Sequence, residues 1–240
     1  MTISVIIPIF NEEEMLPAFL NQTANWLVHE IILVDGNSND QTQGILESFH
    51  RNPLLCPLPQ GVRKAMIGHR LLVAKKGRGN QMNEGAKVAT GDVLLFLHAD
   101  SIFPSDGFFE ISKAMQNTHL VGGAFRLKIQ STSLFFKFIS MMANIRSSIF
   151  GLPYGDQGIF VRREIFSKIG GYPDFPLMED AEFIRQLKHE GMIILLDQAV
   201  TTSARKWHKQ GIVFTSLRNI ILLLLYFMGV SPKQLVKWYD

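Results

Sequence analysis

Short apolar runs recur along the first hundred residues and predict buried strands. They span residues 4–9, 30–34, 71–74 and 93–97. A continuous apolar run of this length is typical of a strand that is covered on both faces. Strands of this kind belong to a mostly parallel sheet, because helices must cross over its faces to connect them.

Segments with helical periodicity separate these runs. Asn11 is expected to cap the first helix, and Glu14 follows it at capping-box spacing. Further helices are expected around residues 45–49 and over residues 80–89. The pattern therefore predicts an α/β fold, with a mostly parallel sheet flanked by helices.

Two acids fall where such a sheet binds its ligands, at the carboxyl ends of the strands. Asp35 follows the second run, and Asp100 follows the fourth. His98 shares a face with Asp100 if the chain stays extended. Asp100 either anchors a divalent cation or caps the following turn, and His98 is either a second ligand or a packed, hydrogen-bonded histidine.

A second group of acids begins a helix that is predicted from residue 179 and ends at Gly191. Asp180 shares a helical stripe with apolar residues three, four and seven positions later, so it is expected to face the interior. Glu182 is expected on the solvated side, and Glu179 is favoured in the first turn by the helix dipole alone. A partly enclosed aspartate suits a general base.

A glycine-flanked polar loop, Tyr-Gly-Asp-Gln-Gly, spans residues 154–158. The loop is either an ordinary turn or a binding loop in which Asp156 and Gln157 hydrogen-bond a polyhydroxyl ligand. Tyr154 is grouped with them.

Composition and missing motifs exclude several classes of function. The chain has 240 residues, a net charge of +3 and one cysteine, Cys56. This favours one domain in a reducing cytoplasm, and the small charge without a basic block argues against nucleic acid as a partner. No export signal, P-loop or G-x-S-x-G elbow is present. Residues 77–82 hold only two of the three glycines of the dinucleotide fingerprint, which argues against hydride transfer. The missing G-x-S-x-G elbow argues against serine hydrolysis.

Four segments together resemble the family-two glycosyltransferases of the GT-A fold. They are "SVIIPIFNEE" (4–13), "IILVDGNSNDQT" (31–42), "KGRGNQMNEGAKVATGDVLLFLHADS" (76–101) and "MEDAEFIRQLKHEG" (178–191). The resemblance extends in order over residues 3–200. It implies inverting transfer of a sugar from a nucleotide diphosphate sugar, with Mn²⁺ or Mg²⁺. A UDP-linked donor is expected, because such donors are the commonest in the family.

The resemblance also assigns roles to single residues. Donor binding is implied for Pro8, Phe10, Glu12, Asp35, Ser38, Arg78, Asn83 and Asp100. The metal is implied to lie on Asp100, with His98 beside it. Asp180 is implied to be the base, and Glu179 or Asp156 would replace it if Asp180 only caps the helix. Apart from the resemblance, Tyr154, Asp156, Gln157 and Trp207 are expected to bind the acceptor.

Two motifs depart from the family pattern. The metal motif D-x-D reads His-Ala-Asp over residues 98–100, which predicts a weak or partly histidine-ligated site. The Q-x-x-R-W motif of processive members is reduced to "SARKW" over residues 203–207, which argues against a polymerase. Within the family, the chain resembles small bacterial members associated with arsenosugar pathways or with acceptors such as carotenoid acids.

The chain is divided into a catalytic domain, residues 1–204, and a tail, residues 205–240. Residues 1–101 are expected to bind the nucleotide sugar and residues 102–204 the acceptor. Two competing functions remain open: a sugar nucleotidyltransferase, and a non-catalytic nucleotide-sugar binding protein.

Two apolar segments raise the question of where the acceptor lies. Residues 220–230 carry no charge, and residues 133–150 carry two, but the first falls short of the ~20 residues that span a bilayer. Either both segments pack on the core, or residues 133–150 and 214–230 share an apolar face. Such a face would meet a membrane surface, a lipid-like acceptor or a second copy, and would place the protein at the inner face of the membrane.

Overall fold

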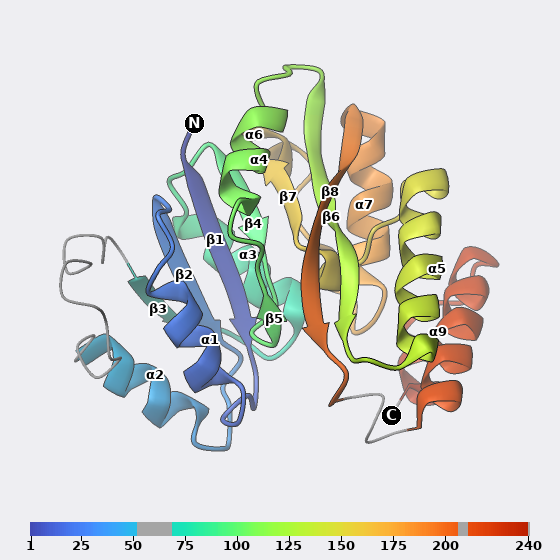
Figure 1. The fold of residues 1–240 in the computed structure, drawn as a ribbon, viewed down its shortest axis with the longest axis horizontal. Helices are drawn as coiled ribbons and strands as arrows, with labels where there is room; N and C mark the ends of the chain where they lie inside the picture. The colour runs from blue at the N-terminus through green and yellow to red at the C-terminus, as the bar shows by residue number, and fades with distance from the viewer. Residues whose placement is uncertain (52–68, 206–210, 240) are drawn as a thin grey trace.

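A single sheet of eight strands forms the centre of the protein (Figure 1). The computed structural model describes residues 1–51, 69–205 and 211–239. Cys56 and the proline-rich loop that contains it lie outside these ranges. The strands are β1 (Ile3–Ile9), β2 (Glu30–Asp35), β3 (His69–Val73), β4 (Val93–Phe96), β5 (Ser101–Ile102), β6 (Leu120–Gln130), β7 (Ile159–Arg162) and β8 (Met192–Ser203).

The strand order is β3-β2-β1-β4-β7-β6-β8-β5. β1 pairs in parallel with β2 and β4, and β2 pairs in parallel with β3, as the apolar runs predict. β7 is antiparallel to both β4 and β6, and β5 is antiparallel to β8. Since β6 and β8 are parallel to each other, β7 and β5 run against the other strands, and the sheet is mixed.

Helices cover both faces of the sheet. One face carries α1 (Leu16–Thr23), α2 (Thr42–Arg51) and α4 (Gly107–Ala114). The other carries α3 (Arg78–Val88), α6 (Arg163–Lys168) and α7 (Glu179–Glu190). The remaining elements are α5 (Leu134–Phe150), the 3₁₀ helix η3 (Gly155–Gln157), α9 (Ile212–Phe227), α10 (Pro232–Leu235) and the 3₁₀ helix η4 (Val236–Trp238).

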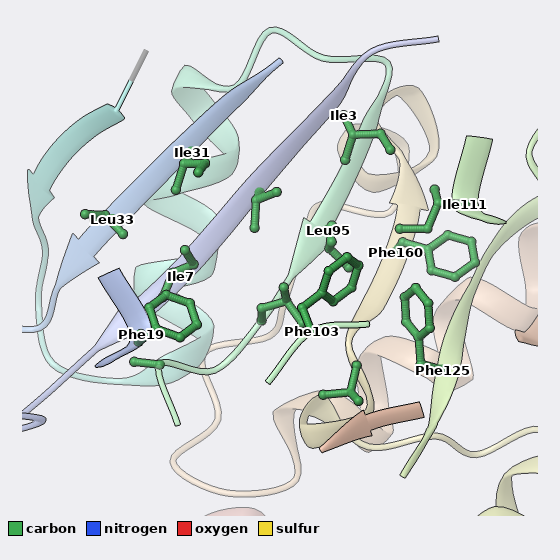
Figure 2. Packing of buried hydrophobic residues seen from close by; sticks show 14 of the residues in the cluster. Ile3, Ile7, Phe19, Ile31, Leu33, Leu95, Phe103, Ile111, Phe125 and Phe160 are labelled. Atoms are coloured by element: carbon green, nitrogen blue, oxygen red, sulfur yellow. The ribbon is translucent and has the colours of Figure 1, made fainter. Parts of the chain in front are cut away.

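Alternate residues of each strand feed two separate cores, because successive side chains point to opposite faces. Ile3 and Ile7 of β1 pack with Phe19 of α1 in one core (Figure 2). Ile6 packs in the other core with Met82 of α3. Burying each such side chain contributes roughly 1.5–3 kcal/mol, which explains why the strands read as continuous apolar runs.

Two local predictions are wrong. Helix α1 begins at Leu16 without a side-chain cap, and Asn11 adopts a positive φ of 53°. The Asn11 side chain accepts a hydrogen bond from the Asn39 backbone N–H (3.0 Å) in the loop after β2. It is therefore used to join two loops and does not cap the helix. Glu182 is also not on the solvated side: it is only 8% exposed.

The C-terminal helices pack through a small cluster of their own. Leu222 of α9 and Leu235 of α10 are buried against Leu177, which precedes α7. Among the helices of residues 1–51, 69–205 and 211–239, none has the length and apolar character needed to cross a membrane.

Candidate functional site

Two pockets meet at the carboxyl ends of β1 and β4. The strand-end pocket has a volume of about 540 Å³, and its walls include Pro8, Phe10, Glu12, Asp40, Gln81 and Arg205. The α9 pocket has a volume of about 210 Å³, and its walls include Tyr154, Asp156, Glu179, Asp180, Thr215 and Asn219. Arg78, His98 and Asp100 line both pockets, so the two form one continuous site.

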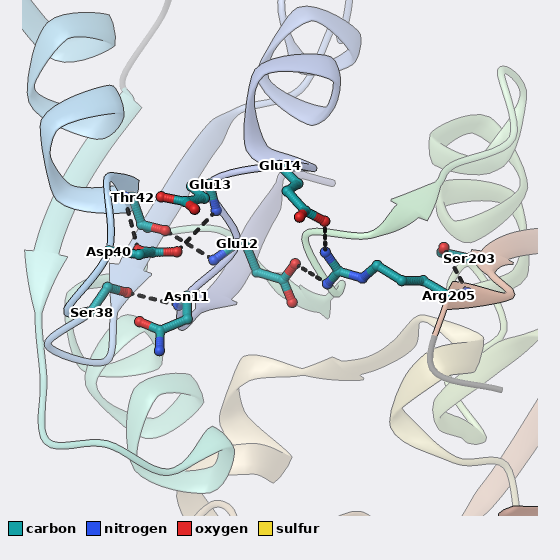
Figure 3. Close-up of polar contacts among 9 residues, drawn as sticks. All are labelled: Asn11, Glu12, Glu13, Glu14, Ser38, Asp40, Thr42, Ser203 and Arg205. Carbon is teal, nitrogen blue, oxygen red and sulfur yellow. Dashed lines mark hydrogen bonds and ion pairs between the residues drawn. The ribbon is translucent and has the colours of Figure 1, made fainter. Parts of the chain in front are cut away.

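Backbone hydrogen bonds lock the loop after β1 onto the loop after β2 (Figure 3). The Asn11 N–H donates to Ser38 Oγ (3.0 Å), and the Glu12 N–H donates to Thr42 Oγ1 (2.9 Å). The Glu13 N–H donates to an Asp40 carboxylate oxygen (3.3 Å). These bonds hold the acidic wall of the strand-end pocket in a fixed conformation.

Asp35 and Ser38 lie behind this wall. The Ser38 hydroxyl donates to Asp35 Oδ1 (2.5 Å), and the Gln43 amide donates to Asp35 Oδ2 (2.8 Å). Both Asp35 and Ser38 are buried. Neither is among the residues that line the two pockets, so in this arrangement they support the loops that do.

Arg205 reaches across the strand-end pocket from the end of β8 (Figure 3). Its Nη2 lies 2.7 Å from a Glu12 carboxylate oxygen, and its Nη1 lies 3.1 Å from Glu14. Burial raises the pKa of the Glu12 carboxyl group, and the Arg205 guanidinium opposes that rise. Arg205 therefore balances part of a wall that would otherwise repel an anion.

Arg78 begins α3 and points at the acids of α7. Its Nε lies 3.3 Å from Glu179 Oε1. Glu179 is only 4% exposed, and burial raises the pKa of its carboxyl group while Arg78 opposes the rise. One turn on, Asn83 is bonded to the backbone of Tyr172 through both atoms of its amide (2.8 and 2.9 Å) and does not line either pocket.

His98 and Asp100 lie in the turn after β4. The strand ends at Phe96 and the chain turns at Asp100, so the extended geometry predicted for the pair does not persist. Both side chains nevertheless line both pockets. Burial raises the pKa of the Asp100 carboxyl group, and the Arg205 and Arg78 cations oppose the rise.

Asp180 and His98 converge on Gly155. The Gly155 N–H donates to Asp180 Oδ2 (2.9 Å). A Cβ at residue 155 would lie 3.1 Å from His98 Nε2 and 3.6 Å from that same oxygen. The absence of a side chain at Gly155 therefore lets the polar loop approach both groups. As the helical phase predicts, Asp180 faces inward, where it lines the α9 pocket.

The polar loop contributes Tyr154 and Asp156 to the α9 pocket, but not Gln157. The Tyr154 ring lies under the Arg146 guanidinium, 3.5 Å from its centroid. Asp156 Oδ1 is buried without a hydrogen-bond partner among the described residues, and burial raises the pKa of this carboxyl group to about 6. Gln157 is fully buried, and its side chain bonds Ser147 and the Phe125 carbonyl.

Helix α9 forms a wall of the second pocket. Thr215 and Asn219 face it, and Thr215 Oγ1 and Asn219 Oδ1 are buried without a partner among the described residues. Further along α9, the Tyr226 hydroxyl donates to Glu182 (2.6 Å), which ties the helix to α7. Trp207, which precedes α9, lies outside the described residues.

No group of three or more His, Cys, Asp or Glu side chains within the described ranges is arranged to hold a metal ion. Asp100 and His98 are potential metal ligands that line both pockets. Mg²⁺ characteristically keeps several waters and binds one or two carboxylates together with substrate phosphates. One carboxylate beside an imidazole therefore fits an ion that a bound diphosphate would help to hold.

Three features of the site were missed by sequence reasoning. The Gln81 amide donates to the carbonyls of Ile9 and Val34 (2.7 and 2.8 Å) and so joins the ends of β1 and β2. Arg205 bonds Glu12 across the strand-end pocket, a pairing that its place in the sequence does not indicate. The polar residues of α9 were overlooked because the helix is so apolar. Only Arg205 had a local signal, its place in "SARKW".

The sequence matches known glycosyltransferases over most of its length. A PGL/p-HBAD biosynthesis glycosyltransferase of Mycobacterium tuberculosis is 31% identical over 178 residues, which cover 70% of this chain and 62% of that one. An undecaprenyl-phosphate 4-deoxy-4-formamido-L-arabinose transferase of Serratia proteamaculans is 29% identical over 166 residues, covering 67% of this chain and 48% of that one. The chain thus spans about half to three fifths of these relatives.

Solved structures share the fold at low sequence identity. The mannosyltransferase PcManGT of Pyrobaculum calidifontis, in complex with GDP-Man and Mn²⁺, has a TM-score of 0.64 at 17% identity and covers 90% of this chain and 59% of that one. The structure of S. aureus TarS 1–349 in complex with UDP-GlcNAc has a TM-score of 0.64 at 18% identity, and the match covers 85% of this chain and 58% of that one. The family model "Glycosyl transferase family 2" matches residues 4–170, and the chain therefore belongs to this family.

Proposed function

We propose that the protein transfers a sugar from a nucleotide diphosphate sugar, with a UDP-linked donor as the first choice, to an acceptor hydroxyl or acid. The observation behind this proposal is the junction of the two pockets at Arg78, His98 and Asp100. The strand-end pocket would hold the donor, and the α9 pocket would hold the acceptor. Residues 1–101 would then bind mainly the donor and residues 102–204 mainly the acceptor, with the tail, residues 205–240, closing the acceptor side.

The strand-end pocket has the charges that a diphosphate requires. Arg78 and Arg205 supply the cations, and five acids in its lining would repel a bare anion. That excess favours a donor that arrives with Mn²⁺ or Mg²⁺, for which Asp100 and His98 are the proposed ligands. When bound, the ion supplies positive charge to the departing diphosphate. Donor contacts are proposed for Pro8, Phe10, Glu12, Arg78 and Asp100, which line this pocket. Asp35, Ser38 and Asn83 do not line it, and their proposed part in donor binding is to hold the segments that do.

Asp180 is the proposed general base. Its Oδ2 is held by the Gly155 N–H, and its side chain faces the α9 pocket. The acceptor oxygen would form a bond to the anomeric carbon while the bond from that carbon to the diphosphate breaks, and Asp180 would take the acceptor proton. A single displacement of this kind inverts the anomeric configuration. Glu179 is the weaker candidate, since Arg78 already pairs with it.

The acceptor is proposed to be a small molecule or a lipid-like compound. Tyr154 and Asp156 line the α9 pocket, and Leu177 and Leu222 add apolar wall. A mixed lining of this kind suits a ligand with a polar head and an apolar body. The name of the undecaprenyl-phosphate transferase relative contains a lipid phosphate, which supports the proposal of a lipid-like acceptor. The arsenosugar and carotenoid-acid subgroup stays a prediction.

The base assignment is tested with Asp180→Asn. The variant keeps the shape of the side chain, so the donor affinity should stay within about twofold while transfer falls by roughly a hundredfold or more. Glu179→Gln, at the preceding residue, is the matched control and should lower the transfer rate by a smaller factor. Donor affinity is measured by calorimetry and transfer by product formation with a lipid phosphate or sugar acceptor panel. A wild-type transfer rate in Asp180→Asn would reject the mechanism.

The metal assignment has a readout that needs no acceptor. Asp100→Ala should remove the Mn²⁺-dependent part of UDP binding and leave the metal-independent part unchanged. His98→Ala should weaken the Mn²⁺ dependence less. Titration of UDP with and without Mn²⁺ measures both, and unchanged Mn²⁺ dependence in Asp100→Ala would exclude it as the anchoring ligand.

A further inference from the structure

Helix α5 packs on the sheet through Phe136 and through two polar side chains. Phe136 is buried against Leu127 and Ile129 of β6. Asn144 accepts a hydrogen bond from the Leu127 N–H (2.7 Å) and donates one to the Leu127 carbonyl (3.0 Å), and the Ser140 hydroxyl accepts from the Ile129 N–H (3.2 Å). Polar side chains of α5 therefore take up part of its inner side, where they satisfy backbone groups of β6.

The opposite stripe of α5 is apolar and faces outward. Its exposed large side chains recur at helical spacing and comprise Leu134, Phe138, Met141, Met142, Ile145 and Ile149. An ordinary surface helix buries its apolar stripe and exposes its polar one. Helix α5 buries Phe136 on the sheet but leaves this second, longer apolar stripe exposed.

Helix α9 likewise carries an exposed apolar stripe. Its inner side combines the buried Leu222 with the buried Thr215 and with the Tyr226 hydroxyl that bonds Glu182. Its outer side exposes large apolar residues at helical spacing: Phe214, Leu217, Ile220, Ile221, Leu224 and Phe227. Both helices lie at the same end of the molecule, away from β3 and α2 (Figure 1). We call their outward apolar stripes the α5–α9 face.

The two segments that form this face carry charge of one sign, since residues 133–150 and 211–239 contain no Asp or Glu. Of their cations, Arg146 and Arg218 bond the carbonyls of Leu152 and Tyr239, which leaves Lys137, Lys233 and Lys237 for the face. Beside α5, a groove of about 490 Å³ combines Lys128 and Lys137 with the apolar side chains of Met141 and Ile145. Trp238, next to Lys237, is also exposed. Apolar side chains, flanking lysines and an aromatic residue together match the boundary between lipid headgroups and acyl chains.

We propose that the α5–α9 face docks on the surface of an anionic phospholipid bilayer. The apolar stripes would enter the upper acyl region, and the lysines would contact headgroup phosphates. A second copy of the chain fits less well, since a two-fold contact through this face would set its cations against identical cations without an acid to pair them. Docking would place the α9 pocket, which shares helix α9 with the face, at the membrane surface.

The proposal is independent of catalysis, so its test needs neither a donor nor an acceptor. The full chain is floated with vesicles of phosphatidylcholine alone and of phosphatidylcholine mixed with phosphatidylglycerol. The wild-type protein should bind the mixed vesicles more strongly, because both the apolar and the electrostatic contributions are available there.

Leu217→Gln combined with Leu224→Gln removes apolar surface from the centre of the α9 stripe without changing the charge. These side chains are 54% and 56% exposed, and their loss should weaken vesicle binding on the order of tenfold or more. The matched control is Leu27→Gln combined with Phe109→Gln, at positions that are 83% and 66% exposed on other elements and should leave binding unchanged. UDP binding and thermal melting confirm that each variant is folded.

The electrostatic part is tested with Lys233→Gln combined with Lys237→Gln. This pair should weaken binding to the mixed vesicles on the order of tenfold and leave the weak binding to phosphatidylcholine alone unchanged. Lys87→Gln with Lys113→Gln is the control, as both lysines are exposed on α3 and α4. Wild-type vesicle binding by the leucine pair would overturn the proposal. So would a wild-type dimer in solution that ignores vesicles and dissociates when the leucine pair is changed.

Discussion

Asp156 offers the sharpest test of the electrostatics of the α9 pocket. Its carboxyl group is half-buried, its Oδ1 has no partner among the described residues, and the charges of Asp180 and Asp100 add to the effect of burial. Burial raises its pKa from 3.8 to about 6. Asp156→Asn replaces the ionisable group with a neutral one of nearly the same shape.

The raised pKa means that the folded protein holds the Asp156 proton more tightly than the unfolded chain does. Stability from this group is fully present below pH 3.8 and is lost as the pH rises through about 6. A shift of this size corresponds to about 3 kcal/mol, of which roughly 2 kcal/mol develops between pH 4.5 and 7.5. Solvent screening of a half-buried group reduces this, so we expect about 1–2 kcal/mol over that interval.

The assay is urea unfolding of the wild-type and Asp156→Asn proteins at pH 4.5 and 7.5. The variant should gain about 1–2 kcal/mol on the wild type between the two pH values, whatever the constant offset from the substitution itself. The repulsion between Asp156 and the charges of Asp180 and Asp100 is already included in this figure, since it contributes to the raised pKa of Asp156. An equal difference in unfolding free energy at both pH values would show that Asp156 titrates normally and that the pocket is well solvated.

Three further outcomes follow from the structure. Arg205→Ala should weaken UDP binding on the order of tenfold, because the negative charge of the acidic wall is then left unbalanced. The control, Arg51→Ala, removes an arginine from an exposed ion pair and should leave UDP binding unchanged. Equal losses of UDP affinity in calorimetry would reject the role of Arg205 in donor binding. Gly85→Ala should lower the unfolding free energy in urea by about 1–3 kcal/mol, because the new Cβ would lie 2.5 Å from an isoleucine of β1. The control, Gly44→Ala on the open side of α2, should not destabilise the protein. Equal effects of the two substitutions would contradict the close packing of α3. Asp35→Asn should reduce UDP affinity by loosening the loop after β2, which Asp35 holds through Ser38 and Gln43, and wild-type UDP affinity in calorimetry would contradict that role.

Local pattern predicted the sheet and the acids at its edge. The runs that became β1, β2 and β4 are buried on both faces, so they are continuous in apolar residues and legible one at a time. The phase of α7 placed Asp180 on the inner side, because helical geometry alone relates it to the apolar residues that follow. Glu182 was misplaced by the same reasoning, since its partner Tyr226 comes from a helix 44 residues later.

The amino-acid sequence by itself determined the strands, most helices, the family resemblance and the candidate acids, because each depends on periodicity or on short motifs. Only the tertiary structure decided which of these groups meet. Arg205 contacts Glu12 across 193 residues, and no local pattern contains that pairing. Likewise, the sequence predicted apolar helices at residues 133–150 and 214–230, but not which side of each faces out. That choice depends on contacts with distant elements: Asn144 bonds β6, Tyr226 bonds Glu182, and Phe136 and Leu222 pack inward, which leaves the remaining apolar residues of both helices exposed.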